Sequence, residues 1–158
     1  MALVLVLVLP AGLISFCALV GYGLGTLGRV GLRRADRQRW LRSSAALLGA
    51  VAAAFYAWGL LHVAGSVLDA EDGGTDSSPL RPCRTPGQWE RALSVVDYTV
   101  DYLPLRFVCE TKDGGTYAAE SVPGYVNPAV LGFALATAVS LGAAAFESER
   151  PGGSGPAV

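Results

Sequence analysis

Two of the three cysteines, Cys83 and Cys109, are the side chains of this chain that are best suited to covalent chemistry. A thiol-disulfide enzyme typically carries a Cys-x-x-Cys pair, in which one thiolate is activated by its neighbour. Cys83 and Cys109 are far apart in the sequence, and neither has an adjacent His or Lys, although Arg84 follows Cys83. The spacing favours a structural disulfide, and redox catalysis remains an alternative.

The single histidine, His62, lies in an apolar segment close to Tyr56 and Trp58. An ionisable side chain inside a membrane is a functional candidate by default. A lone histidine without a thiol or carboxylate at ligand spacing makes a poor metal site, however. We therefore expect His62 to be a structural residue near a membrane interface, beside an aromatic belt residue.

Three glycines, Gly23, Gly25 and Gly28, match the text of the GxGxxG dinucleotide motif. That motif needs a strand before it, a helix after it and an acidic residue about 20 positions further on. Residues 45–49 contain no acid, and a second long apolar segment follows, so we reject this match. No catalytic residue, metal ligand or cofactor is predicted, and the later acids are interpreted as solvated surface: Asp97, Asp101, Glu110, Asp113 and Glu120.

Three segments without Asp, Glu, Lys or Arg organise the chain, at residues 2–28, 43–68 and 128–146. A helix needs about 20 residues to cross the bilayer core, so each segment is predicted to be a transmembrane helix. A cleaved signal peptide is the alternative for the first segment. It is less favoured, because no basic residue precedes Arg29.

Small residues recur every four positions in these segments, and Gly21 and Gly25 are one such pair. Pairs of this kind let membrane helices approach closely. Gly21 and Gly25 therefore favour either a tight helix bundle or self-association, and the alternative is that such spacings arise by chance from the abundance of Ala and Gly. Cys17, in the same segment, is interpreted as a lipid-facing or packing residue.

Arginine dominates the connection at residues 29–42, where six arginines face one acid, Asp36. Positive charge stays on the cytoplasmic side of membrane helices. The connection is therefore predicted to be cytoplasmic, with the N-terminus outside and residues 147–158 forming a disordered cytoplasmic tail. The same side chains are predicted to contact anionic lipid headgroups: Arg29, Arg33, Arg34, Arg37, Arg39 and Arg42.

The segment 69–127 is then extracytoplasmic, with an acidic linker at 69–78 and a folded cap at 79–127. A capping box from Thr85 to Gln88 predicts a short helix over residues 86–95. Alternating apolar residues predict three strands, over residues 96–102, 105–111 and 116–122. Asp113 and Gly114 supply the turn of the second hairpin. The expected fold class is a membrane α-helical protein with a small α+β cap, built from one helix and a three-stranded meander.

The predicted location supports a disulfide between Cys83 and Cys109, because thiols oxidise outside the cytoplasm. So small a cap buries little core by itself. A bridge that closes a loop of about 25 residues stabilises by roughly 3 kcal/mol in the chain-entropy model.

The external segment contains Tyr102-Leu-Pro-Leu-Arg-Phe-Val-Cys109, followed by Val122-Pro-Gly-Tyr-Val-Asn-Pro128. With the three spans and the abundance of Ala, Arg and Gly, these stretches make the chain resemble the uncharacterised small integral membrane proteins of actinobacterial type. The resemblance implies a membrane location and no activity.

These features predict a non-enzymatic membrane protein of the cell envelope, which acts through its cap as an accessory or interaction subunit. The expected partners are membrane lipid and either another membrane protein or further copies of the chain. A small oligomeric transport or ion-conducting component is one alternative, and a membrane thiol-disulfide enzyme is another. The net charge of −1 and the absence of a basic, aromatic-laced soluble patch argue against nucleic acid as a partner.

Overall fold

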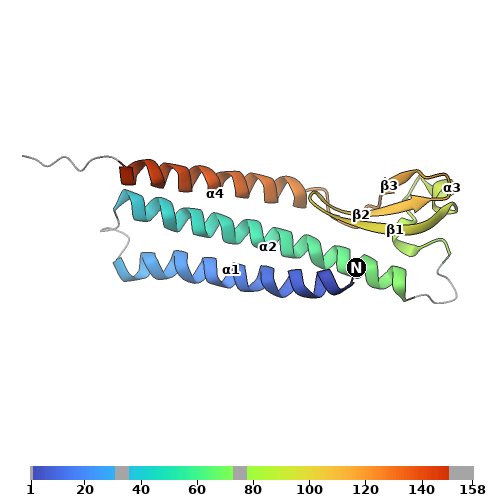
Figure 1. Cartoon of the computed structure of the whole chain (residues 1–158), viewed down its shortest axis with the longest axis horizontal. Coiled ribbons are helices and arrows are strands. Elements are labelled where there is room, and N and C mark those ends of the chain that lie inside the picture. The colour runs from blue at the N-terminus through green and yellow to red at the C-terminus, as the bar shows by residue number, and fades with distance from the viewer. Residues whose placement is uncertain (1, 31–35, 73–77, 150–158) are drawn as a thin grey trace, which may run out of the picture.

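The structure is a computed structural model that describes residues 2–30, 36–72 and 78–149. Three long helices lie side by side: α1 (Ala2–Val30), α2 (Arg37–Glu71) and α4 (Val126–Glu149). A small sheet stands at one end of this bundle, and the end of α1 and the start of α2 lie at the other end (Figure 1). The described arginines of residues 29–42 and the predicted cap are therefore at opposite ends of the molecule.

Helix α2 is the centre of the bundle, because it packs against both α1 and α4. It contains 35 residues, which corresponds to about 52 Å and exceeds the roughly 30 Å of a bilayer core. The predicted segment 43–68 is thus extended at both ends. At its start the Asp36 carboxylate accepts a hydrogen bond from the backbone N–H of Arg37, 2.9 Å away.

All three long helices are long and apolar enough to cross a membrane. Helices α1 and α4 bury few of their side chains inside the protein, and large apolar residues such as Ile14 and Val139 are about 70% exposed. An apolar surface of this extent is not stable in water and needs a hydrocarbon environment. The prediction of three membrane-spanning helices agrees with this architecture, although α4 begins two residues earlier than expected. Residues 147–149, predicted as part of a disordered tail, belong to α4, and residues 150–158 of that tail lie outside the described part of the chain.

The sheet is an antiparallel meander of β1 (Val95–Tyr102), β2 (Leu105–Thr111) and β3 (Thr116–Ala118). Leu103 and Pro104 form the first turn, as their position predicts, because Tyr102 pairs directly with Leu105. In the second turn Gly114 has a φ of +76°, and its N–H donates to the Thr111 carbonyl. The three-stranded meander is confirmed, but β3 is three residues long rather than the seven predicted at 116–122.

Strand alternation places one face of the sheet in a core. Leu105, Phe107 and Cys109 of β2 are buried, and Arg106 between them is exposed. A bulge in β1 between Val95 and Asp97 breaks this alternation at its start. Val96, the first residue of the predicted strand over residues 96–102, is 56% exposed.

The predicted helix over residues 86–95 is wrong in length and in its start. A 3₁₀ turn, η1 (Arg81–Cys83), comes first, and the helix α3 (Trp89–Ala92) has only four residues. Gln88 is the N-cap residue, with no hydrogen bond from its side chain. The Thr85 hydroxyl is buried without a hydrogen-bond partner, so the expected capping box does not form.

The cap is not a self-contained unit, because the end of α2 supplies its second layer. Leu60, Val63 and Val67 of α2 are buried against the inward face of the sheet, in one core with Phe107 and Cys109. Residues 69–71, predicted as part of a flexible linker, belong to α2, and residues 73–77 of that linker lie outside the described part of the chain. One helix therefore runs without a break from the arginine-rich end to the floor of the cap.

Two further contacts join the cap to the helices. The Asn127 side-chain amide at the start of α4 accepts from the Leu105 N–H at 2.9 Å and donates to the Leu105 carbonyl at 3.0 Å. At Gly59 of α2, an added Cβ would lie 2.6 Å from Leu105 and 2.8 Å from Val126. Only a glycine lets α2, β2 and α4 meet so closely.

Candidate functional site

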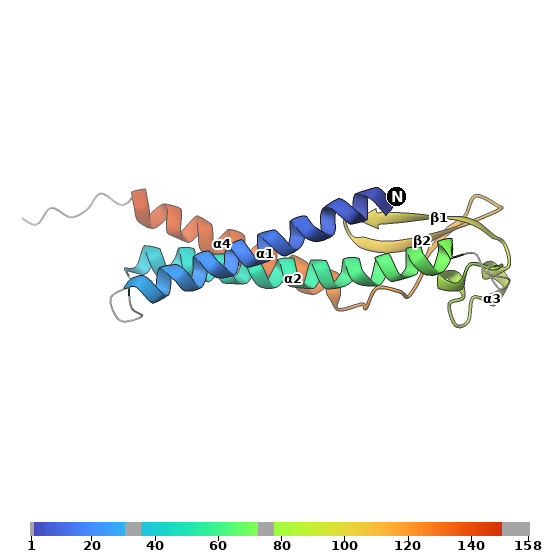
Figure 2. The ribbon, with the colours of Figure 1, turned by 90° about the horizontal axis from the view of Figure 1, so that it is seen from below.

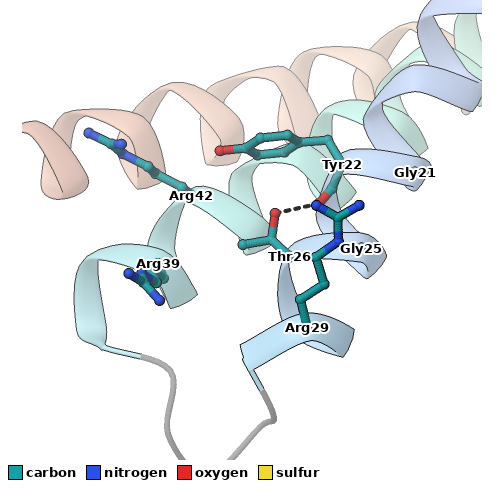
Figure 3. A pocket seen from close by; sticks show the side chains of 7 residues that line it. All are labelled: Gly21, Tyr22, Gly25, Thr26, Arg29, Arg39 and Arg42. Atoms are coloured by element: carbon teal, nitrogen blue, oxygen red, sulfur yellow. Dashed lines mark hydrogen bonds between the residues drawn. The ribbon is translucent and has the colours of Figure 1, made fainter.

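Three of the predicted arginines line a cavity at the end of the bundle opposite the cap. The cavity has a volume of about 520 Å³ and lies between α1 and α2. Arg29 on α1 extends back along its own helix toward Gly25, and Arg39 and Arg42 belong to the facing helix (Figure 3). The remaining lining residues all come from α1, which contributes Gly21, Tyr22, Gly25 and Thr26.

Glycines shape the wall that α1 contributes to this cavity. An added Cβ at Gly21 or Gly25 would meet no atom within 4 Å. Within the described chain, Gly21 and Gly25 therefore make no helix contact, and self-association through them stays a prediction. The contact is made at Gly23, whose added Cβ would lie 2.9 Å from the Leu47 side chain of α2. Gly23 faces α2, and Gly21 and Gly25 face the open cavity.

The other predicted arginines are placed differently. The Arg37 guanidinium forms an ion pair with the Glu147 carboxylate of α4 at 3.0 Å. Arg33 and Arg34 lie outside the described residues. Among the described arginines at the end of the bundle opposite the cap, Arg37 is the one that forms an ion pair. This ion pair links the start of α2 to the end of α4.

An apolar groove adjoins the arginine-lined cavity. It has a volume of about 330 Å³ and shares Tyr22 and Arg42 with that cavity. Its other lining residues are supplied by all three long helices: Leu19, Ala45, Ala46, Thr137 and Leu141. Because the first cavity is rich in guanidinium groups and the second is almost wholly apolar, the two together can hold an amphipathic anion.

His62 lies on α2 near the cap end of the bundle and is half-buried. Its ring packs edge-on against Trp58, with the ring centroids 5.0 Å apart. The Trp58 indole N–H in turn donates to the Tyr125 hydroxyl at 3.3 Å. Among the described residues, no group of three His, Cys, Asp or Glu side chains is placed to hold a metal ion. The structure thus sets His62 beside the aromatic ring of Trp58.

Cys83 and Cys109 form the predicted disulfide, and their Cα atoms are 6.0 Å apart. Both residues are fully buried. The Tyr117 hydroxyl donates to the Cys83 carbonyl at 2.7 Å, and burial raises the pKa of Tyr117. The bridge therefore joins η1 to β2, the middle strand of the sheet, inside the buried core. Cys17 is the free cysteine and is exposed on α1.

The end of α2 is bonded to the sheet through Tyr98. Its hydroxyl donates to the Glu71 carboxylate at 2.9 Å, and its ring stacks on Phe107. Burial, reinforced by the hydrogen bond and the charge of Glu71, raises the pKa of Tyr98 to about 12. No sequence pattern pairs these two residues, because the contact depends on α2 continuing through residues 69–71.

The end of the cap farthest from the bundle presents apolar side chains. Trp89, Leu93 and Val96 are 55%, 58% and 56% exposed. They belong to α3, its C-cap and the start of β1, which lie at the far end of the molecule in both ribbon views (Figures 1 and 2).

No family model matches this chain, and no curated protein or solved structure is similar to it. The similarity to membrane proteins of actinobacterial type stays a prediction.

Proposed function

We infer that this protein is a non-enzymatic interaction subunit of the cell envelope, which binds a partner protein through the far end of its cap. The exposed group of Trp89, Leu93 and Val96 carries this proposal. Clustered apolar side chains outside the membrane are typical of protein contact sites. Aromatic residues such as Trp89 contribute disproportionately to the energy of such contacts.

The proposed orientation sets the cap outside the cell and the arginine-rich end inside. Arg29, Arg39 and Arg42 support it through the positive-inside rule. Trp40 and Trp58 mark the two membrane surfaces on α2, since both are about half exposed and 18 positions apart. That spacing is about 27 Å along a helix, close to the thickness of a bilayer core.

In this register, residues 41–57 of α2 span the membrane and residues 59–71 stand above it as the floor of the cap. A partner bound to the cap is then connected rigidly to the helices. The disulfide supports the same orientation, because such bridges persist in oxidising compartments. The N-terminus of α1 and the start of α4 lie on the cap side, and α4 ends on the cytoplasmic side.

Purification in mild detergent after cross-linking in cells tests the proposal. The wild-type chain should retain one heterologous membrane or envelope protein in a fixed ratio. Trp89→Ser with Leu93→Ser should lose it, because both side chains are removed from the contact surface. Lys112→Ala with Asp113→Ala is the matched control, because these exposed residues of the second turn are polar. A ring of identical chains that survives both double substitutions would contradict the proposal and favour the transport alternative.

A further inference from the structure

We propose that the arginine-lined cavity binds the phosphate of one anionic phospholipid, whose acyl chain lies in the adjoining apolar groove. The site is formed by α1, α2 and α4 and requires only that these helices span a membrane. It is independent of the partner proposed for the cap.

The positive charge of the cavity favours binding of an anion. Within the described residues, no acidic side chain forms an ion pair with Arg29, Arg39 or Arg42, whereas the nearby Arg37 has Glu147. Guanidinium groups match the geometry of phosphate oxygens and bind them in a bidentate manner. A phosphate in the cavity would offset part of this positive charge.

The shape of the cavity leaves space for a bound ligand. Gly21 and Gly25 leave the wall of α1 without side chains, and a Cβ at either position would meet no protein atom. The volume of about 520 Å³ falls in the range of roughly 300–1,000 Å³ that ligand sites occupy. A side chain at Gly25 would project into the site, and its Cβ would meet no neighbour.

The adjoining groove identifies the source of the phosphate as a lipid rather than a soluble ion. The groove meets the cavity at Tyr22 and Arg42 and continues past Leu19 and Leu141. A free phosphate does not pack against apolar walls, whereas the acyl chain of a membrane lipid can make van der Waals contacts along them. The cavity also lies at the ends of the spanning helices, where basic pockets meet lipid headgroups.

Native mass spectrometry of the full-length chain in mild detergent tests the site with phosphatidylglycerol, phosphatidylcholine and inorganic phosphate as probes. Phosphatidylglycerol should bind roughly a hundredfold more tightly than phosphatidylcholine, as the combined effect of three arginines. Arg42→Gln should reduce that preference about fivefold. Gly25→Leu should abolish most of it while every arginine is retained.

Gly12→Leu is the matched control, because Gly12 is also open, on the same helix and away from the cavity. Both substitutions replace glycine by a better helix former, so equal helical content and thermal midpoints would exclude unfolding as the cause of lost binding. Unchanged lipid preference in Gly25→Leu would overturn the proposal, since surface charge alone would then explain binding. Displacement of phosphatidylglycerol by an equal concentration of inorganic phosphate would overturn it as well.

Discussion

Removal of the Cys83–Cys109 disulfide should destabilise the cap and leave the spanning helices in place. The bridge joins residues 26 positions apart, and both cysteines are fully buried. Opening a loop of this size costs roughly 3 kcal/mol of unfolding free energy in the chain-entropy model. The loss of stability should affect the sheet and η1, because the contacts of α2 with α1 and α4 do not involve the disulfide.

Urea unfolding in mild detergent, followed by tryptophan fluorescence, measures this loss. A unit as small as the cap should have an m-value of about 1 kcal/mol/M, so Cys83→Ala with Cys109→Ala should lower the midpoint by about 3 M. Reduction of the wild-type protein should give a similar shift. Cys17→Ser is the control and should give none, because Cys17 is exposed and unbridged. A shift below about 0.5 M in the double variant would refute the reasoning.

Three further predictions concern the contacts of the cap. Gly59→Ala should destabilise the protein by about 1–3 kcal/mol through overpacking, whereas Gly65→Ala, in open space on the same helix, should be neutral or stabilise by up to about 1 kcal/mol. Equal thermal midpoints for the two variants would contradict the packing at position 59. Asn127→Ala should cost about 2–3 kcal/mol, because it leaves the backbone N–H and C=O of buried Leu105 without their partner. Unchanged hydrogen-exchange protection of the Leu105 amide would count against that contact. Tyr98 should titrate near pH 12 by ultraviolet absorbance, later than an ordinary tyrosine near 10, and Tyr98→Phe should remove one tyrosine from the late component, to which the buried Tyr117 also contributes. Because its pKa is raised on folding, its contribution to stability is complete below about pH 10 and is lost as the pH rises to about 12.

The spans and the strands were predictable because each depends on a pattern within one segment. An uncharged stretch of about 20 residues marks a helix that crosses a membrane, and alternation marks a half-buried strand. The extension of α2 was not predictable in this way. Leu60, Val63 and Val67 suit a lipid-facing helix as well as a cap core, and only the tertiary fold shows that a sheet covers them. The bulge that exposes Val96 is likewise set by pairing with β2.

The arginine-lined cavity shows the same limit. Each arginine was visible in the sequence, but the cavity is formed only when α1 and α2 pack through Gly23 and leave Gly21 and Gly25 facing outward. Three glycines at two-residue spacing do not reveal which of them makes the contact. The sequence alone shows Asn127 only as the residue that precedes Pro128. Its two hydrogen bonds could not be predicted, because they are made to a strand residue 22 positions earlier in the chain.

Cysteine accessibility in intact cells tests the central claim, that the cap and the arginine-rich end lie on opposite sides of the membrane with the cap outside. In a Cys17→Ser background, Asp113→Cys places a thiol in the exposed second turn of the cap, and Ser148→Cys places one at the exposed end of α4. A membrane-impermeant maleimide should label Asp113→Cys in intact cells and Ser148→Cys only after the membrane is opened. Labelling of Ser148→Cys alone in intact cells, or of both variants, would contradict the account.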